Sequence, residues 1–322
     1  MQGECGERRL RHAIAGERRS GIIANMNPIP LLADSPAAID ALSRIEVLYS
    51  DLDGTLLGVG GSLLVGGDGH PSILTAEAVL RLNVAGLPVV LTTGRNRIQT
   101  SEISRLLGWR GFIAELGCVI VPDRGAEPIY FTGAWPADAL GAGETPFERI
   151  ERAGALSALT RAFPGRLEPH APYHLDREAT HVLRGLLDVS EAQAVLGELD
   201  VPIEIVDNGI IHPLSTGLAE LPEIHAYHLI PAGVTKAGAV ASDIARRGLG
   251  REQAAAIGDS ASDVAMADAC ALAVVVANAC DDARVAREAA SRTNVFATAG
   301  KRGDGWAQFA QMLLAARGLP RG

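Results

Sequence analysis

The stretch that decides the fold is IEVLYSDLDGTLL, residues 45–57. Its apolar beginning, residues 45–49, predicts a buried β-strand. Two carboxylates, Asp51 and Asp53, stand where this strand ends, and open α/β sheets bind their ligands beyond the carboxyl ends of their strands. Because unpaired carboxylates are costly to bury, the arrangement indicates that a cation or a proton-transfer reaction uses them.

Strands and helices alternate along most of the chain. Further strands are expected at residues 88–92, 112–114, 254–257 and 272–276. Helices are expected at residues 76–84 (with Thr75 as N-cap), 97–107, 235–247, 264–269, 281–290 and 304–316. Strand–helix–strand units join parallel strands through right-handed crossovers. We therefore expect an α/β fold with a Rossmann-like parallel sheet.

The middle of the chain is richer in proline, histidine and charge than the rest. Its patterns predict helices at residues 147–162 and 190–199 and strands at residues 180–186 and 202–207. This texture is typical of a separate α+β unit. We therefore expect an inserted unit at residues 125–228, between two core segments at residues 45–124 and 229–322.

The beginning of the chain, residues 1–44, is expected to be a flexible extension. It contains an Arg-rich stretch, and no apolar segment of a secretory signal follows that stretch. Met26 is an alternative start, and residues 37–43 are expected to form a short helix.

The composition narrows the classes of function. The net charge of -9 leaves no basic excess to neutralise nucleic-acid phosphates, so we expect no nucleic-acid partner. No run approaches about 18 apolar residues, so we expect no membrane span. The four cysteines lack a C-x-x-C spacing, which favours free thiols in a reducing cytoplasm. The oligomeric state stays open.

Polar residues follow other expected strands and begin one expected helix. Thr93 follows the strand at residues 88–92, and Asp259 and Asp263 follow the strand at residues 254–257. Lys236 lies in the first turn of the helix at residues 235–247, and it is one of only two lysines in the chain. We expect these side chains to meet Asp51 and Asp53 at one edge of the sheet.

Four carboxylates gathered at one edge would repel one another. A divalent cation and a lysine would offset that repulsion. Carboxylate oxygens are ligands that suit Mg²⁺, which binds few protein carboxylates and keeps waters or phosphate oxygens. The sequence therefore predicts a Mg²⁺ site formed by Asp51, Asp53, Asp259 and Asp263.

These residue types match phosphoryl transfer through an aspartyl phosphate. In this interpretation Asp51 attacks phosphorus, while Asp53 is first the general acid and then the general base. Thr93 and backbone N–H groups near Gly94 hold the phosphoryl oxygens, and Lys236 stabilises the charge of the transferring group.

Four motifs carry a resemblance to a known family. They are DLDGTL at residues 51–56, TGR at residues 93–95, GVTKA at residues 233–237 and GDSASD at residues 258–263. In order and placement the chain resembles haloacid dehalogenase-superfamily hydrolases of the Cof-like type, which carry an α/β cap. This type is similar to sucrose-phosphate and mannosyl-3-phosphoglycerate phosphatases. The resemblance covers about residues 45–320 and implies a Mg²⁺-dependent phosphatase for a small phosphorylated metabolite, such as a sugar phosphate.

The fourth motif departs from the subfamily at Ser262, where an asparagine is usual. The departure replaces an amide with a hydroxyl near the expected metal. For substrate binding we assign four residues, two in the second motif and two in the inserted unit: Gly94, Arg95, Arg184 and Asn208.

Several other sites are less well supported by the spacing. The glycine-rich segment at residues 58–69 lacks the Gly-Lys-Ser/Thr ending of a P-loop, so a flap beside the site is expected instead. A calcium loop starting at Asp51 would need a glutamate where Ser62 stands. His170, His174 and His181 match no familiar zinc spacing.

Two other functions stay open at this point. A phosphomutase of the phosphomannomutase type shares the first motif and an α/β cap, and isomer formation without phosphate release would identify it. A non-catalytic protein that binds a phosphorylated metabolite is the other. Such proteins normally lose a motif-one aspartate or the lysine, whereas this chain keeps Asp51 and Lys236.

Overall fold

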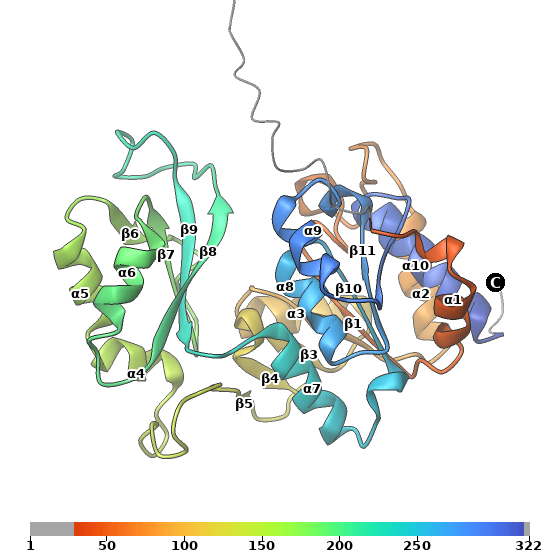
Figure 1. Ribbon diagram of the computed structural model, residues 1–322, viewed down its shortest axis with the longest axis horizontal. Helices are drawn as coiled ribbons and strands as arrows, with labels where there is room; N and C mark the ends of the chain where they lie inside the picture. Colours follow the sequence, from red (N-terminus) through yellow and green to blue (C-terminus); the bar gives the residue numbers. More distant parts are fainter. Residues whose placement is uncertain (1–28, 319–322) are drawn as a thin grey trace, which may run out of the picture.

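The computed structural model describes residues 29–318. Within this range the chain forms an eight-stranded sheet and a four-stranded sheet. Figure 1 shows them as two lobes, the smaller at the left and the larger at the right. We call the lobe around the large sheet the core and the lobe around the small sheet the cap.

The core sheet is mainly parallel. Its strands are β1 (Val47–Ser50), β2 (Val89–Thr92), β3 (Phe112–Ala114), β4 (Val119–Val121), β5 (Ile129–Tyr130), β10 (Ala254–Gly258), β11 (Leu272–Val275) and β12 (Val295–Ala297). They lie in the order β12-β11-β10-β1-β2-β3-β4-β5. The pairing is parallel from β12 to β3, and β4 runs antiparallel to both of its neighbours, β3 and β5. The expected α/β fold is confirmed, and the carboxyl ends of β1, β2 and β10 share one edge.

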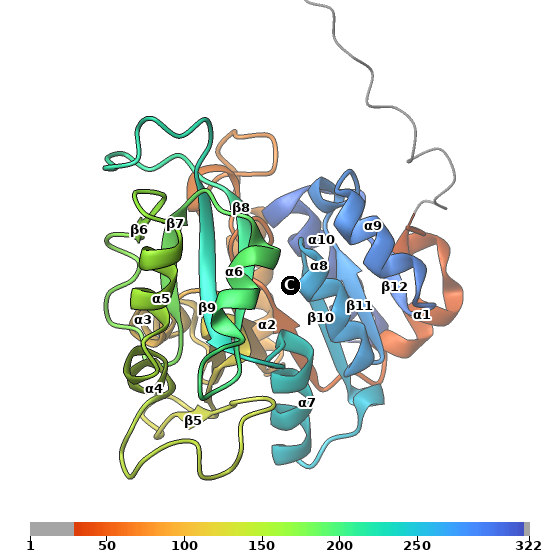
Figure 2. The same ribbon diagram turned by 60° about the vertical axis from the view of Figure 1, so that its left-hand side comes forward.

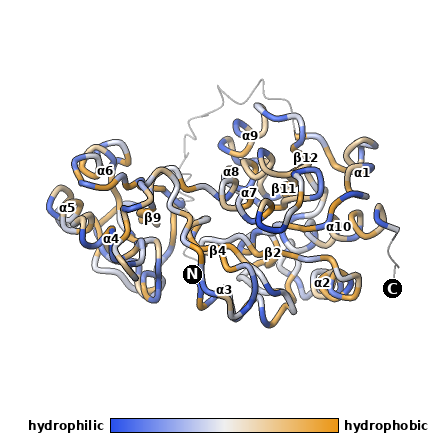
Figure 3. Tube along the Cα trace, turned by 90° about the horizontal axis from the view of Figure 1, so that it is seen from below, coloured by the Kyte–Doolittle hydropathy of each residue, from blue (hydrophilic) through white to orange (hydrophobic). Residues whose placement is uncertain are grey.

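Helices cover both faces of the core sheet. They are α1 (Pro36–Leu42), α2 (Leu74–Val84), α3 (Arg97–Leu107), α7 (Lys236–Arg246), α8 (Ala261–Val264), α9 (Ala283–Ala290) and α10 (Arg302–Ala316). Alternate residues of β1 serve the two faces, as strand geometry requires. Leu48 packs in the cluster that includes α1, α2 and α10, whereas Val47 and Tyr49 pack in the cluster that includes α7 and α9. Figure 3 shows the resulting hydrophobic centre along β2 and β4.

The cap sheet is antiparallel, in the order β6-β7-β9-β8. Its strands are β6 (Leu167–Pro169), β7 (His181–Gly185), β8 (Ile203–Ile210) and β9 (His225–Pro231), and its helices are α4 (Pro146–Arg152), α5 (Ala155–Ala162) and α6 (Val189–Leu196). Leu183 and Tyr227 belong to the apolar cluster with these helices, whereas their neighbours Val182 and His228 line a cavity. In Figure 2 the cap, with β9, lies at the left, and the core, with β10 and β11, lies at the right. None of the helices in residues 29–318 is long and apolar enough to cross a membrane.

Residues 29–44 were expected to belong to a flexible extension, but in the structure they pack on the core. Leu31 bridges to Ala297, the last residue of β12, and Leu32 and Leu42 are fully buried. Apolar side chains on α1 and α10 supply the packing surface, a long-range contact that the local pattern does not reveal. The expectation for residues 1–28 lies outside the described residues.

Other expected bounds also shift. The core sheet continues past residue 124, because β5 pairs with β4, and β9 runs across the expected boundary at residue 228. The helix expected at residues 147–162 is two helices, since Gly154 between them has φ 78°. Helix α2 begins at Leu74, so Thr75 lies inside it and is not its N-cap.

Candidate active site

A cavity of about 720 Å³ lies between the core and the cap. The core lines it with residues that follow β1, β2 and β10 and with the start of α7: Asp51, Asp53, Thr93, Gly94, Arg95, Lys236, Asp259 and Asp263. The cap lines it mainly with His170, Tyr173, Arg177, Asn208 and His228. Two segments of the chain separated by the whole cap thus meet at one sheet edge, as the topology requires.

Lys236 is the central cation of the core side. Its Nζ donates to Asp51 Oδ1 at 2.8 Å and to Asp263 Oδ1 at 2.7 Å. All three side chains are buried, with 5% of Lys236 exposed. Burial disfavours the ammonium, but the charges of Asp263 and Asp51 outweigh it and raise the pKa of Lys236. Lys236 thus stays charged and fixes both carboxylates.

Asp263 is held by the turn between β10 and α8. Its Oδ2 accepts from the backbone N–H groups of Asp259 and Ser260 at 3.1 and 3.0 Å and from Ser260 Oγ at 2.6 Å. Its Oδ1 is therefore left for Lys236. The Ser262 hydroxyl lies 2.9 Å from Ser260 Oγ and lines the cavity, so the unusual residue in this motif joins the same turn.

Asp259 faces Asp51 across the edge of the sheet. Asn278, which follows β11, donates from Nδ2 to Asp259 Oδ2 at 3.3 Å and to the Gly54 carbonyl at 3.1 Å. A Cβ at Gly54 would lie 2.1 Å from Asp259 Oδ2, and Gly54 has φ 82°. Both the close approach and the left-handed backbone therefore require glycine here.

Carboxylate oxygens of Asp51, Asp259 and Asp263 all lie within 4.8 Å of one another. Burial is the main cause that raises the pKa of both Asp51 and Asp259, and neighbouring carboxylates add to it. Lys236 supplies one positive charge against three carboxylates, so the group still favours a cation. A hard-oxygen donor set of this kind fits Mg²⁺. Asp53, which was also expected as a ligand, is not in this group.

Asp53 instead forms an ion pair with Arg95. Arg95 donates from Nε to Asp53 Oδ2 at 2.8 Å and from Nη2 to Asp53 Oδ1 at 2.5 Å, a bidentate arrangement. The backbone N–H of Arg95 also reaches Thr93 Oγ1 at 3.3 Å. Thr93, Gly94 and Arg95 all line the cavity, but the guanidinium of Arg95, which was expected to bind substrate, pairs with Asp53.

The two cap residues assigned to the substrate lie in different surroundings. Asn208 lines the cavity. Arg184 does not; its Nε donates to Glu168 Oε1 at 2.6 Å, and its side chain is only 8% exposed. Glu168 also accepts from Thr216 Oγ1 at 2.7 Å. Arg184 therefore connects strands and a loop within the cap, which differs from the expected substrate contact.

Sequence reasoning left other cavity residues unassigned. Asn278 follows β11, so the rule that placed the other core residues would have found it. His228 and Tyr173 had no such signal, because their directions depend on the register of the cap sheet and on a loop. His181, in contrast, stacks on Phe147 at 3.7 Å, away from the cavity lining.

Comparison with known families now adds to the geometry. The haloacid dehalogenase-like hydrolase family matches residues 48–139 and 222–295, more than half of the chain. The matched segments hold every core residue that lines the cavity on β1, β2, β10 and α7. The unmatched interval, residues 140–221, falls in the cap.

Curated relatives of the chain are archaeal phosphoglycolate phosphatases. That of Methanothrix thermoacetophila is 26% identical over 238 residues, which cover 73% of this chain and 85% of the relative. That of Methanosarcina acetivorans is 26% identical over 262 residues, which cover 81% of this chain and 93% of the relative.

Solved structures share the fold over nearly their whole length. A haloacid dehalogenase-like hydrolase from Bacteroides thetaiotaomicron has a TM-score of 0.54 at 17% identity, covering 83% of this chain and 98% of its own. The sucrose-phosphatase from Synechocystis has a TM-score of 0.54 at 13% identity, covering 84% and 98%. The chain belongs to the haloacid dehalogenase-like hydrolases, and it is a phosphoric monoester hydrolase, as the sequence predicted.

Proposed function

We propose that the protein is a Mg²⁺-dependent phosphatase that hydrolyses a small phosphorylated metabolite through an aspartyl phosphate on Asp51. The observation that carries the proposal is the buried contact of Lys236 with Asp51 and Asp263, beside Asp259. A nucleophilic carboxylate, a fixed cation and a hard-oxygen metal site are the components that phosphoryl transfer needs.

Asp51 is the proposed nucleophile. Its Oδ1 accepts from Lys236, which leaves Oδ2 to attack phosphorus. As the new O–P bond forms, the ester P–O bond breaks, and the leaving alkoxide takes a proton from Asp53. Water then attacks phosphorus, gives a proton to Asp53, and releases phosphate with the Asp51 carboxylate restored.

Arg95 must change partners for this reaction. At rest it binds both oxygens of Asp53. A bound phosphoryl group offers the guanidinium a competing bidentate partner. We therefore propose that substrate binding draws Arg95 from Asp53 to the phosphoryl oxygens. Asp53, which is ionised in its pair with Arg95, then takes up from solvent the proton that it gives to the leaving alkoxide.

Asp51, Asp259 and Asp263 are the proposed metal ligands. Mg²⁺ bound there supplies positive charge that neutralises the phosphoryl oxygens. Lys236 neutralises two of these carboxylates, Asp51 and Asp263, and keeps them in place before substrate arrives. Ser262 adds a hydroxyl at the rim of this group.

The cap is the proposed site of substrate selection. The cavity, about 720 Å³, is in the size range of small-molecule sites, and His170, Tyr173 and His228 offer polar groups opposite the carboxylates. Because the curated relatives are phosphoglycolate phosphatases, we propose 2-phosphoglycolate as the first substrate to test, alongside sugar phosphates.

Phosphate release from a panel of these esters, with and without EDTA, tests the proposal. We expect release that depends on Mg²⁺, and a fall of about 10⁴-fold in kcat for Asp51→Asn, the magnitude seen when nucleophiles are removed elsewhere. If Asp51→Asn keeps most of the Mg²⁺-dependent activity, the covalent mechanism is wrong. Isomer formation in place of phosphate release would instead identify a mutase.

A reducing cytoplasm is the proposed location. The cysteines in the described part of the chain, Cys118, Cys270 and Cys280, are free thiols. Persistent disulfides are typical of oxidising compartments, so this pattern favours a reducing one.

A further inference from the structure

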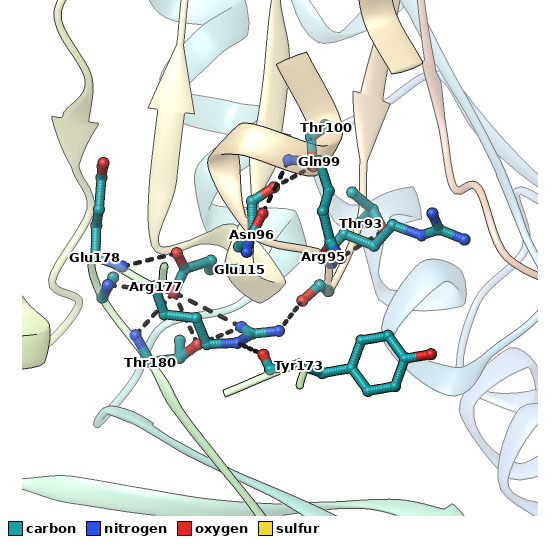
Figure 4. A network of polar contacts seen from close by, with 12 residues as sticks. Thr93, Arg95, Asn96, Gln99, Thr100, Glu115, Tyr173, Arg177, Glu178 and Thr180 are labelled. Atoms are coloured by element: carbon teal, nitrogen blue, oxygen red, sulfur yellow. Dashed lines mark hydrogen bonds and ion pairs between the residues drawn. The ribbon is translucent and has the colours of Figure 1, made fainter. Parts of the chain in front are cut away.

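A buried carboxylate joins the core to the cap beside the cavity. Glu115 follows β3 and is fully buried. Its Oε1 accepts from the backbone N–H of Glu178 at 2.9 Å, and its Oε2 accepts from the N–H groups of Ala179 and Thr180 at 3.2 and 2.9 Å. A fourth bond comes from Thr180 Oγ1 at 2.8 Å. Figure 4 shows this carboxylate lying against the cap segment.

The backbone at Glu115 is held in an unusual conformation. Glu115 has φ 51° and the next residue, Leu116, has φ 60°. Residues other than glycine enter this region at a cost of about 1 kcal/mol or more. Strain of this kind persists only where surrounding contacts determine it. Here the backbone N–H groups of Glu115 and Leu116 donate to the carbonyls of Arg95 and Thr93 in the core, and the Glu115 carboxylate accepts from the cap segment.

Arg177, at the start of the same cap segment, reaches back to the core. Its Nη2 donates to the Gly94 carbonyl at 2.9 Å, and its Nη1 donates to Thr180 Oγ1 at 2.6 Å and lies 3.7 Å from Glu115 Oε2. Its Nε donates to the Tyr173 carbonyl at 2.8 Å. The side chain is only 4% exposed, so the guanidinium is fixed in place.

The Gly94 carbonyl belongs to the same peptide unit as the Arg95 N–H. That N–H points to Thr93 Oγ1, 3.3 Å away. Because the peptide unit is planar, orienting its carbonyl also orients its N–H. The planar Gly94–Arg95 peptide unit therefore connects Arg177 in the cap to the Thr93 hydroxyl, which we assign to the phosphoryl oxygens.

We propose that Arg177, held by Glu115, is a positioning residue that couples the seating of the cap to the orientation of the phosphate-binding residues Thr93 and Gly94. The inference rests on the proposed phosphatase function for the role of Thr93. Arg177 acts through the Gly94 peptide and not on the reacting atoms. Without the hydrogen bond from Arg177 to the Gly94 carbonyl, the orientation of Thr93 and Gly94 no longer depends on how the cap is seated.

Hydrogen exchange tests the coupling without any turnover. The probe is inorganic phosphate, added with Mg²⁺ to the full chain. Because coupling between two sites is reciprocal, phosphate held at Thr93 must stabilise the cap segment, so exchange at the amides of Glu178, Ala179 and Thr180 should slow on adding phosphate. Arg177→Met should lose this phosphate-dependent slowing while it retains its fold by circular dichroism.

Kinetics supply the second measurement. We expect kcat of Arg177→Met to fall about 10²-fold, as small misplacements of positioning groups do elsewhere, and Arg177→Lys to recover little, because one ammonium cannot reach three separate acceptors. The matched control is Arg152→Met, which breaks an ion pair with Glu144 inside the cap and should leave kcat and the phosphate effect unchanged.

Three results would overturn the inference. The first is wild-type protein in which phosphate does not slow hydrogen exchange at the cap amides. The second is an Arg177→Met variant in which phosphate still slows that exchange, and the third is an Arg177→Met variant with wild-type kcat. The phosphatase proposal fails separately, through an active Asp51→Asn variant, and that result leaves the exchange coupling between phosphate and the cap standing.

Discussion

The two sides of the cavity are built differently. On the core side, Lys236 donates to both Asp51 and Asp263, so these side chains are in place before any ligand arrives. On the cap side, the buried Nδ1 atoms of His170 and His228 have no hydrogen-bond partner within residues 29–318. Buried polar groups without partners are costly, and a ligand that supplies the partner removes that cost. The core is thus preorganised for chemistry, whereas the cap is completed by what binds to it.

The variant with the largest expected effect removes Lys236, the central cation of the core side. Lys236→Met keeps the length of the side chain but leaves Asp51 and Asp263 without their shared donor. We expect kcat/KM at saturating Mg²⁺ to fall about 10³-fold, the order expected for losing a preorganised charge at a reacting centre. Steady-state phosphate release measures it.

Lys301→Met is the matched control, because Lys301 is the other lysine of the chain and lies exposed before α10. It should retain wild-type activity. If kcat/KM of Lys236→Met stays within tenfold of wild type, catalysis does not depend on this cation. The core side would then not be preorganised by Lys236, and the difference drawn between core and cap would be wrong.

The core side could be predicted because its residues follow a topological rule. Asp51, Thr93 and Asp259 each come directly after an apolar strand, and parallel strands bring such positions to one edge. The strands themselves are buried on both faces, so their apolar runs were easy to recognise.

The cap could not be predicted to the same depth. Its short strand β6 pairs only at three positions, and which side of β7 and β9 faces the cavity depends on a register that the sequence does not reveal. Arg184 looked like a substrate contact for this reason. The packing of residues 29–44 was missed because it depends on contacts with α10 at the far end of the chain.

The second test concerns the close approach that shapes the core side. A Cβ at Gly54 would meet Asp259 Oδ2 at 2.1 Å, and φ 82° adds backbone strain. Gly54→Ala should therefore displace Asp259, weaken Mg²⁺ binding and lower kcat/KM about 10²-fold. Titration of activity with Mg²⁺ separates the loss of affinity from the loss of rate.

Gly60→Ala is the control for strain alone. Gly60 has φ 73°, but a Cβ added there would have no atom of residues 29–318 within 4 Å. It should destabilise the protein slightly and leave the Mg²⁺ dependence unchanged. Equal effects of the two variants would attribute the Gly54 result to the backbone and not to contact with Asp259.

The third test separates residues that stabilise the fold of the cap from residues that contact the substrate. Arg184→Met removes the partner of Glu168, and breaking a largely buried ion pair costs about 3 kcal/mol of unfolding free energy. KM should change less than about twofold, whereas Asn208→Ala, which alters the cavity lining, should raise KM. A large rise in KM for Arg184→Met would instead restore the substrate role that the sequence suggested. Urea unfolding and steady-state kinetics give the two readouts.

The smallest expected effect is a pH dependence of stability that comes from His181 in the cap. Burial, together with the nearby charges of Arg177 and His174, lowers the pKa of His181 from 6.5 to about 4, although the hydrogen bond of its ring with the Phe147 carbonyl at 3.0 Å opposes the shift. Below pH 6.5 the unfolded chain gains a proton at this position that the folded chain does not accept until about pH 4. Stability therefore falls as pH is lowered through this window.

Between pH 7 and pH 5 the loss attributable to His181 should be about 2 kcal/mol. Other buried histidines add to the total, since burial also lowers the pKa of His228. The informative quantity is therefore the difference between wild type and His181→Gln, whose amide can still donate to the Phe147 carbonyl. Urea unfolding at pH 7, 6 and 5 should show a shallower decline for the variant. Parallel declines would mean that His181 is protonated as readily in the folded cap as in the unfolded chain, which requires a cap that admits water to this ring.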